Sequence, residues 1–568
     1  MKSFLKLSAF YVATVLVVSG CNGKLDEEPK SILVPSYFKT AQGIDAGVTA
    51  AYSGLRYQYG PEGSMIITVS GTDEFSVGDG ANTDGVSINA YNAGLSADNG
   101  QFLTPWNNNF TYINTCNGVI DFGPEANLDA ATRTRLIAEA QYLRAHYYFL
   151  LVQTYGAVPL DLGSGVLKFN TNPTSQSERS PVGDVYAAII TDLTTAATNL
   201  PDKPFQTGRA SKAAAKHLLA KVYLTRAGSV AKQSDDYQRA FETAKELIDN
   251  KSVYGLNLLQ DFGDVNKQGQ EHSSESIFTV EHTSDLVFNE SDVNAPASGL
   301  KENRSLYLFT PYYEIQTVGG KSPVIRDMNY QRPWRRFAPT SWLLNTAFAD
   351  KTNDSRYDNT FRTVWFANTS DASRLPAGMS MGDTAFYMPG RAVTDAERAA
   401  KKYRIYAPSD YTKGMYPHMK KFDDTKRAAV NYSSTRAFMV HKFSETYLIA
   451  AEAALMMGNK EDAVTYLNVL RQRAAYRPGK DNSAAITAMT ITDPNVVTLD
   501  FILDERSREL CGEQHRWFDL VRTGKLIERV KLYNPEGAAN IQERHTLRPI
   551  PQSQINLTVN KFPQNPGY

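Results

Sequence analysis

Apolar side chains recur at helical spacing along one long stretch of the chain, residues 132–155. The residues that share this face are Leu136, Ala140, Leu143, Tyr147 and Leu150. Charged residues take the other faces, which is the pattern of an amphipathic helix. Gly156 follows directly, and Pro159 prevents the helix from resuming at once. The sequence therefore predicts a long amphipathic α-helix over 132–155.

Similar patterns predict further helices in both halves of the chain. They cover 181–200, 211–226 and 236–250, and then 443–457 and 461–473, which are separated by Gly458 and Asn459. Two helices joined by a short glycine-containing turn form the plan of a tetratricopeptide-like hairpin. The period is irregular and the usual tryptophan consensus is missing, so the pattern by itself supports only paired helices. We predict a mainly α fold on a scaffold of helical hairpins.

The character of the sequence changes over residues 254–440. Asn, Asp, Gly, Pro and Tyr dominate there, and short alternating segments such as 276–280 indicate strands. A stretch this long without regular structure is unusual in a compact domain unless it is functional. We therefore predict one domain over 37–568, in which a helical scaffold (37–253 and 441–568) carries a loop-rich ligand-binding layer (254–440) with a few short strands.

The N-terminus has the features of an export signal. The positively charged residues Lys2 and Lys6 lie at the start of an apolar run. The small residues Ser19 and Gly20 stand directly before Cys21. The run is shorter than the roughly 20 apolar residues of a membrane span. The pattern resembles bacterial lipoprotein signals, which implies a signal peptide over 1–20 and lipidation of Cys21. The alternative is that Cys21 is a small residue within an ordinary signal peptide.

Residues 21–36 are polar and acidic, which is typical of a solvated tether. A Lys-Asp-Glu-Glu cluster close behind the cysteine resembles the surface-export signal of Bacteroidota lipoproteins. The resemblance implies a lipid anchor in the outer membrane, with the protein facing the exterior.

Charge and cysteine content argue against a nucleic-acid-binding protein and against a small domain held together by disulfides. The whole chain has 60 basic and 60 acidic residues, and removing Lys2 and Lys6 with the signal leaves a net charge of −2. The protein as a whole therefore has no positive charge that would attract nucleic acid. Apart from Cys21, only Cys116 and Cys511 remain, which argues against a disulfide scaffold. We expect two buried thiols, although a bridge between them is an alternative.

Several phrases along the chain are similar to signatures of the SusD/RagB family of outer-membrane lipoproteins. They are AQYLRAHYYF (140–149) with YGAVPL (155–160), GRASKAAA (208–215), ESIF (275–278), DSR (354–356), YLIAAEA (447–453), ERSREL (505–510), RWFDLVRTG (516–524) and the terminal QNPGY (564–568). The resemblance implies a SusD-like fold and a protein that binds oligosaccharides or, in some members, peptides. It also implies a SusC-like TonB-dependent transporter as the partner beneath the protein.

The signature residues themselves are expected to serve the fold. Arg516, Asp519 and Arg522 alternate with the apolar bulk of Trp517, which suits a helix locked to its neighbours by ion pairs and a buried indole.

A glycan-binding surface needs flat aromatic faces for sugar rings, with amides, carboxylates and arginines for the hydroxyl groups. Two stretches, 72–106 and 303–342, supply this mixture, and the second also holds Arg332 and Arg336. The predicted ligand-binding residues are Asp73, Asn82, Tyr91, Asn92, Phe102, Tyr307, Tyr312, Trp334 and Arg335. Trp334 lies in the polar segment QRPWRR. Its indole is predicted either to stack against a ligand or to be buried in a structural role, and the sequence leaves both alternatives open. Trp106 and Trp342 are predicted to be core residues.

Residues 79–85 are similar to a calcium loop, but they lack the EF-hand spacing, so an ordinary Asx-rich turn is favoured. We predict no metal and no cofactor, with calcium as the weaker alternative. No arrangement of carboxylates singles out an acid and a base for glycoside hydrolysis. The sequence predicts a binding protein and not an enzyme. A peptide-binding member of the same family and a lipid-anchored glycoside hydrolase are the alternatives.

Overall fold

The computed structural model describes residues 35–172, 174–292 and 298–568. The expected signal peptide, Cys21 and most of the expected tether lie outside the described residues. The tether was predicted to extend to residue 36, but helix α2 (Pro35–Phe38) already includes its last two residues.

The six helices predicted by residue range are all confirmed, with ends that agree to within two residues. The N-terminal helices are α3 (Ala41–Gly54), α6 (Leu103–Phe122), α7 (Ala130–Tyr155), α8 (Val182–Asn199), α9 (Lys212–Ala227) and α10 (Asp236–Asp249). The C-terminal helices are α17 (Phe443–Met456), α18 (Lys460–Ala474), α20 (Leu499–Leu510), α21 (Arg516–Arg522) and α22 (Leu526–Tyr533). The six confirmed helices are α7, α8, α9, α10, α17 and α18. The fold is therefore mainly α, as predicted.

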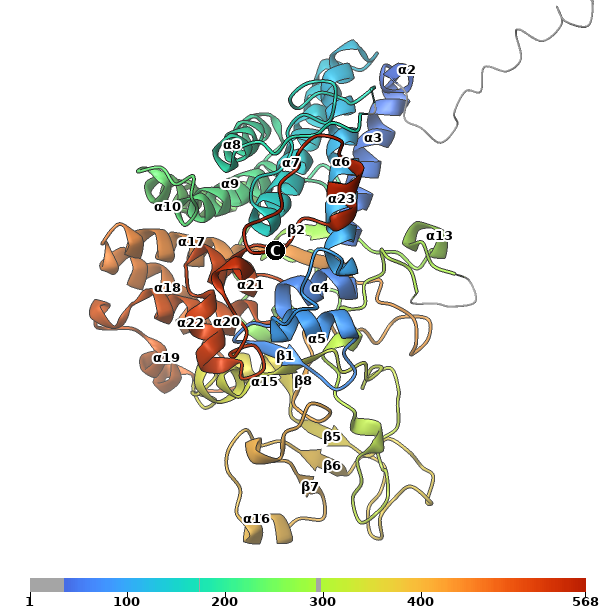
Figure 1. Cartoon of the computed structure of the whole chain (residues 1–568). Coiled ribbons are helices and arrows are strands. Elements are labelled where there is room, and N and C mark those ends of the chain that lie inside the picture. Colours follow the sequence, from blue (N-terminus) through green and yellow to red (C-terminus); the bar gives the residue numbers. More distant parts are fainter. Residues whose placement is uncertain (1–34, 173, 293–297) are drawn as a thin grey trace, which may run out of the picture.

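The helices form one continuous array although the chain interrupts it. Each helix packs on the next in the order α3, α6, α7, α8, α9 and α10, and α17 then packs on α10 and α18 on α17 (Figure 1). The pair α17 and α18 therefore extends the array of N-terminal helices, although the long insertion separates α10 from α17 in the sequence.

Helix α7 differs from its prediction as an amphipathic helix. From Leu136 to Tyr155 it is buried on nearly every face, because it packs against α3, α6, α8 and α9. Its charged residues are buried with partners: Arg144 Nε lies 2.8 Å from Asp192 Oδ2 of α8, and Glu139 pairs with Arg209 at 3.1 Å. The charged residues that the sequence pattern places away from the apolar face therefore form buried ion pairs, and they do not face solvent.

Short two-stranded sheets tie the insertion to the scaffold. Strand β2 (Ser276–Val280) pairs antiparallel with β9 (Phe438–Lys442), so the two ends of the layer lie side by side. Strand β1 (Phe75–Val77) pairs with β3 (Phe337–Pro339), and β4 (Phe361–Arg362) pairs with β8 (His418–Met419). A three-stranded sheet of β5 (Val364–Phe366), β6 (Thr384–Tyr387) and β7 (Arg404–Ile405) forms the far end of the layer (Figure 1).

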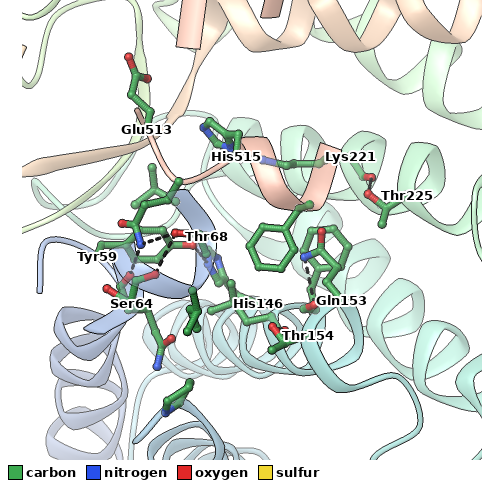
Figure 2. A pocket seen from close by; sticks show the side chains of 18 of the residues that line it. Tyr59, Ser64, Thr68, His146, Gln153, Thr154, Lys221, Thr225, Glu513 and His515 are labelled. Carbon is green, nitrogen blue, oxygen red and sulfur yellow. Dashed lines mark hydrogen bonds between the residues drawn. The ribbon is translucent and has the colours of Figure 1, made fainter. Parts of the chain in front are cut away.

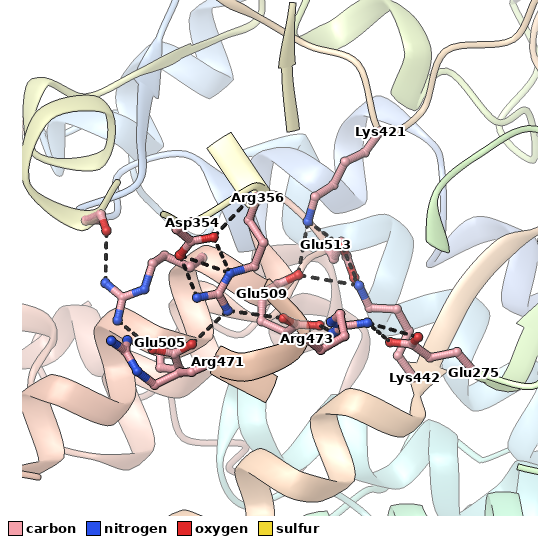
Figure 3. A network of polar contacts seen from close by, with 12 residues as sticks. Glu275, Asp354, Arg356, Lys421, Lys442, Arg471, Arg473, Glu505, Glu509 and Glu513 are labelled. Carbon is pink, nitrogen blue, oxygen red and sulfur yellow. Dashed lines mark hydrogen bonds and ion pairs between the residues drawn. The ribbon is translucent and has the colours of Figure 1, made fainter. Parts of the chain in front are cut away.

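A buried ion-pair network joins the layer to the scaffold (Figure 3). The fully buried Arg356 lies 2.7 Å from Asp354, 2.7 Å from Glu505 and 3.2 Å from Glu509. Arg473 of α18 connects Glu509 to Glu275, directly before β2. Many of these residues belong to the family-like phrases noted above, so those phrases serve the fold.

The remaining structural predictions are also resolved. Cys116 and Cys511 are free buried thiols, so the alternative bridge does not form. Trp106 and Trp342 are core residues, as predicted. Trp517 is fully buried, and Arg516, Asp519 and Arg522 are in ion pairs. Within the described ranges, no helix is both long enough and apolar enough to cross a bilayer.

Candidate functional site

The two predicted loop regions meet on the layer. Gly78 N donates to Arg336 O at 3.0 Å, and Gly80 N donates to Arg335 O at 3.2 Å. A side chain does not fit at either glycine, because a Cβ atom would lie 2.2 Å from the carbonyl oxygen of Arg335 or Trp334, respectively. The turn at 78–80 therefore needs glycine to approach the 334–336 segment.

A third segment completes this surface and was missed by the sequence analysis. Asp79 N donates to Lys413 O at 3.0 Å, and Tyr312 N donates to Gly414 O at 2.6 Å. Nothing in the local composition of this short turn distinguishes it from the rest of the layer. Only the tertiary contacts place it here. We call the surface formed by 78–82, 304–312, 332–336 and 413–414 the loop surface.

Trp334 is the half-buried aromatic centre of the loop surface. Its indole lies 5.2 Å from the ring of Tyr307, which is fully buried and supports it from below. Three guanidinium groups lie within cation–π distance of its ring centroid: Arg304 at 5.7 Å, Arg332 at 5.2 Å and Arg336 at 5.0 Å. The indole therefore combines apolar area with a strongly cationic surrounding.

Arg335 and Tyr312 form the neighbouring part of the loop surface. The Arg335 guanidinium stacks 4.1 Å from the Tyr312 ring centroid, and its Nε lies 2.5 Å from Asp79 Oδ1. Both Gln331 and Arg335 adopt positive φ angles, 63° and 53°. A left-handed backbone is unfavourable for side-chain-bearing residues and is common at ligand-binding positions. The segment that presents Trp334 is thus held in a defined conformation at both ends.

Asn82 also reaches this region, but mainly as a structural residue. It caps helix α5 (Thr83–Ala90) by accepting from Gly85 N at 2.7 Å, and its amide donates to Glu62 Oε1 at 3.1 Å. The same Glu62 oxygen lies 2.6 Å from Arg336 Nε. Asn82 therefore helps to position the carboxylate that holds Arg336.

Four of the predicted ligand residues are buried, and their expected ligand contact must be corrected. Asp73, Phe102 and Tyr307 are completely buried and Tyr91 is 1% exposed. The Tyr91 hydroxyl donates to Gly71 O at 2.6 Å, and the Tyr307 hydroxyl donates to Tyr432 O. These aromatic residues occur in loop-like sequence, but tertiary packing encloses them.

Asp73 is buried against two arginines of the C-terminal helices. Burial opposes its ionisation, but Arg516 and Arg529 outweigh this and hold the pKa of Asp73 below its usual range. The adjacent Glu74 is also buried, and burial raises its pKa to about 7. This pair of carboxyl groups with separated pKa values lies inside the protein, away from any sugar at the surface.

Asn92 is not brought to the loop surface. It lies just beyond the far end of α5 from Asn82, and its side chain accepts from Gly94 N at 2.8 Å. Of the nine predicted residues, the structure brings Asn82, Tyr312, Trp334 and Arg335 together as partly accessible side chains.

The region that was compared with a calcium loop is an Asx-rich turn, which was the favoured interpretation. Its polar side chains point to separate partners: Asp79 to Arg335, Asn82 to Gly85 N, and Asp84 to the amide of Gln101 at 3.2 Å. The carboxylates therefore do not converge on one cation.

A small cavity lies at the junction of the scaffold helices (Figure 2). It has a volume of about 60 Å³ and is lined by residues of α4 (Glu62–Val69), α7, α9 and the segment before α21, among them His146, Lys221 and His515. Ligand pockets in proteins typically hold roughly 300–1,000 Å³. This cavity has room for a few water molecules and not for a sugar ring.

Next to this cavity, His217, His441 and Glu445 bring possible metal ligands within 4.8 Å of one another. Glu445 already lies 2.9 Å from Lys221 Nζ and 3.0 Å from Arg506 Nη2. These two cations neutralise the carboxylate and oppose a divalent ion at the same place. We therefore interpret these three residues as part of a buried network of polar contacts within the scaffold, and not as a metal site.

The architecture defines a class of protein: a tetratricopeptide-like helical scaffold that carries a loop layer with an aromatic and arginine-rich surface. Comparison with known proteins identifies the family. Residues 274–568 match the model of the SusD family, and residues 25–224 match a model described as "Starch-binding associating with outer membrane". The chain belongs to the SusD family, as the sequence signatures predicted.

Relatives and solved structures agree with this assignment. SusD-like protein P2 of Formosa agariphila is 26% identical over 99% of this chain and 100% of its own. A SusD-like protein of Bacteroides ovatus is 27% identical over 50% of each chain. A laminarin-binding SusD-like protein has the same fold, with a TM-score of 0.68, 23% identity, and coverage of 93% of this chain and 100% of that one. Surface glycan-binding protein A of Bacteroides thetaiotaomicron, solved with laminarihexaose, gives a TM-score of 0.66 at 22% identity, covering 93% of this chain and 99% of that one.

Proposed function

We propose that this protein captures oligosaccharides at the cell surface on its loop surface and passes them to a TonB-dependent transporter of the outer membrane. The observation that carries the proposal is the half-buried Trp334, held where distant loops meet and surrounded by arginine side chains. Membership of the SusD family and the glycan-binding names of similar structures support it.

Binding without catalysis is the proposed activity. Asp79 of the loop surface is engaged with Arg335, and Glu62, which lies beside the surface at the start of α4, is engaged with Arg336. A glycosidase needs one carboxyl group to give a proton and a second to attack or activate water. Carboxylates held in ion pairs suit neither role, so the glycoside hydrolase alternative has little support from this surface.

Lipidation of Cys21 and the surface location are parts of the same proposal. They rest on the signal-like N-terminus, because Cys21 lies outside the described residues. An anchor at that position, followed by a short tether, would keep the helical body beside a transporter in the same membrane.

A binding screen tests the proposed function. The purified protein is applied to an array of glycans and peptides, and the binding partner found is then incubated with the protein and analysed by mass spectrometry. We expect an oligosaccharide to bind and to be recovered intact. A peptide as the only ligand would contradict glycan capture, and cleavage of the bound glycan would contradict pure binding. Co-purification with the transporter from membranes tests the delivery step.

A further inference from the structure

The three arginines around Trp334 differ in their partners. Arg304 lies 3.5 Å from Glu302, and Arg336 lies 2.6 Å from Glu62. Arg332 has its guanidinium 5.2 Å from the indole centroid, but among the described residues it makes no ion pair and no hydrogen bond. Arg332 is therefore the one guanidinium of these three without a carboxylate from the described part of the chain.

The surroundings of Arg332 make its positive charge unfavourable. Burial lowers the pKa of Arg332, and the nearby charges of Arg326, Arg336 and Arg304 lower it further. Arg326 does not share its counter-ion, because it forms a two-point pair with Glu314 at 3.0 and 2.6 Å. A half-buried cation beside like charges costs free energy unless an anion approaches it.

Two carboxylates are directed elsewhere: Asp327, which is near Arg332 in the sequence, and Asp79, which belongs to the loop surface. Asp327 accepts from the backbone N–H groups of Asn329 and Tyr330 at 2.9 and 2.8 Å and from the amide of Asn368 at 2.8 Å. Asp79 is held by Arg335. The protein thus leaves the Arg332 guanidinium available to a group from outside.

A guanidinium group binds planar or tetrahedral oxyanions through two parallel N–H donors. Beside it, the indole of Trp334 offers apolar area of the kind that packs against a sugar ring. We propose that the loop surface binds an acidic glycan, in which a uronate carboxylate or a sulfate ester pairs with Arg332. This inference rests on the proposed function, since it names the class of glycan that is captured.

Calorimetry with probes of different charge tests the inference. The probes are an oligogalacturonate, a sulfated carrageenan oligosaccharide, neutral laminarihexaose and an acidic oligoglutamate peptide. We expect at least one acidic glycan to bind at least tenfold more tightly than laminarihexaose, and its affinity to fall as salt is raised. The carboxylate and sulfate probes distinguish the two sources of the anion.

Variants assign the effect to one side chain. We expect Arg332→Gln to weaken acidic-glycan binding at least tenfold and Arg332→Lys to weaken it less. The matched control is Arg391→Gln, because Arg391 pairs with Glu397 and is 62% exposed, outside the loop surface. Since Arg332 makes no ion pair and no hydrogen bond among the described residues, the thermal midpoint of Arg332→Gln should stay close to that of the parent.

Each contrary outcome has a separate meaning. If laminarihexaose binds as tightly as the acidic glycans, or if Arg332→Gln leaves acidic-glycan affinity unchanged, this inference is wrong while glycan capture stands. If no glycan binds, the proposed function fails. If only the acidic peptide binds, both are contradicted.

Discussion

Arg516 and Asp73 form a buried two-point ion pair, with Nε 2.7 Å from Oδ1 and Nη2 2.6 Å from Oδ2. Arg529 adds a third contact at 2.5 Å from Oδ2. The pair joins the segment before β1 to helices α21 and α22, although 443 residues separate the two partners in the sequence. Asp73 therefore ties the segment before β1, the strand that pairs with β3 of the layer, to the C-terminal helices.

We predict that Asp73→Asn strongly destabilises the protein, because Arg516 and Arg529 then lose their shared buried anion. Removing one partner of a buried pair typically costs about 3–5 kcal/mol. Chemical denaturation measures the loss. The control is Asp235→Asn, which breaks an exposed pair with Arg239 and should leave the free energy of unfolding almost unchanged. Unchanged stability together with weaker glycan binding would instead restore Asp73 as a ligand residue.

Arg356 gives a second test of the buried network. Arg356→Met leaves Asp354, Glu505 and Glu509 without their common cation. We expect a loss of about 3–5 kcal/mol in the free energy of unfolding. Arg239→Met, which breaks an exposed pair with Asp235, serves as the control and should lose far less stability. Equal losses in the two variants would show that the buried network contributes no more to stability than an exposed ion pair does.

The close approach of the 78–80 turn predicts an effect of a single methyl group. In Gly80→Ala the new Cβ would lie 2.2 Å from Trp334 O, so the backbone that presents the indole has to move. We expect glycan affinity to fall and stability to decrease by about 1–3 kcal/mol. In the control Gly183→Ala, the added Cβ lies 3.9 Å from Ala231 and fits. Full affinity in Gly80→Ala would mean that the position of Trp334 does not matter for binding.

The buried histidines predict a loss of stability in acid. Burial, followed by the charge of Lys221, lowers the pKa of His146 to about 3, whereas an unfolded histidine titrates near 6.5. The unfolded chain therefore binds a proton below pH 6.5 that the folded protein excludes. This contribution is fully present above pH 6.5 and declines by roughly 1.4 kcal/mol per pH unit as the pH falls towards 3. Burial lowers the pKa of His515 to about 4, with the same sign.

His146→Gln isolates this contribution from opposing groups such as Glu74, whose raised pKa favours the folded state as the pH falls from 7. Denaturation is measured at several values between pH 7 and pH 4 for the parent and the variant. We expect the variant to lose stability less steeply below pH 6.5. Parallel curves for the two proteins would contradict a neutral buried His146.

Local patterns in the sequence were sufficient for most of the scaffold. The helix at 130–155 ends at Tyr155, as its spacing and the following Gly156 indicated. Its burial on nearly all faces was not predictable, because Arg144 and Glu139 find their partners on other segments. Helical periodicity is encoded in neighbouring residues, whereas the pairing of a charge depends on contacts far along the chain.

The same limit explains the mixed outcome at the loop surface. The composition of 303–342 directed attention to Trp334, Tyr312 and Arg335, which the structure brings together on the loop surface. It did not distinguish them from Tyr307, which has the same character but lies underneath the indole. Lys413 and Gly414 join the surface through backbone hydrogen bonds, which leave no signal in residue type.

The most direct test of glycan capture at the loop surface is calorimetric titration of the parent, Trp334→Ala and Phe205→Ala with the glycan that the array selects. Phe205 is 67% exposed and lies outside the loop surface, so it controls for loss of an aromatic side chain. We predict that Trp334→Ala weakens binding at least tenfold, about 1.4 kcal/mol, while Phe205→Ala binds like the parent. Equal affinity of the parent and Trp334→Ala would contradict this assignment of the binding site.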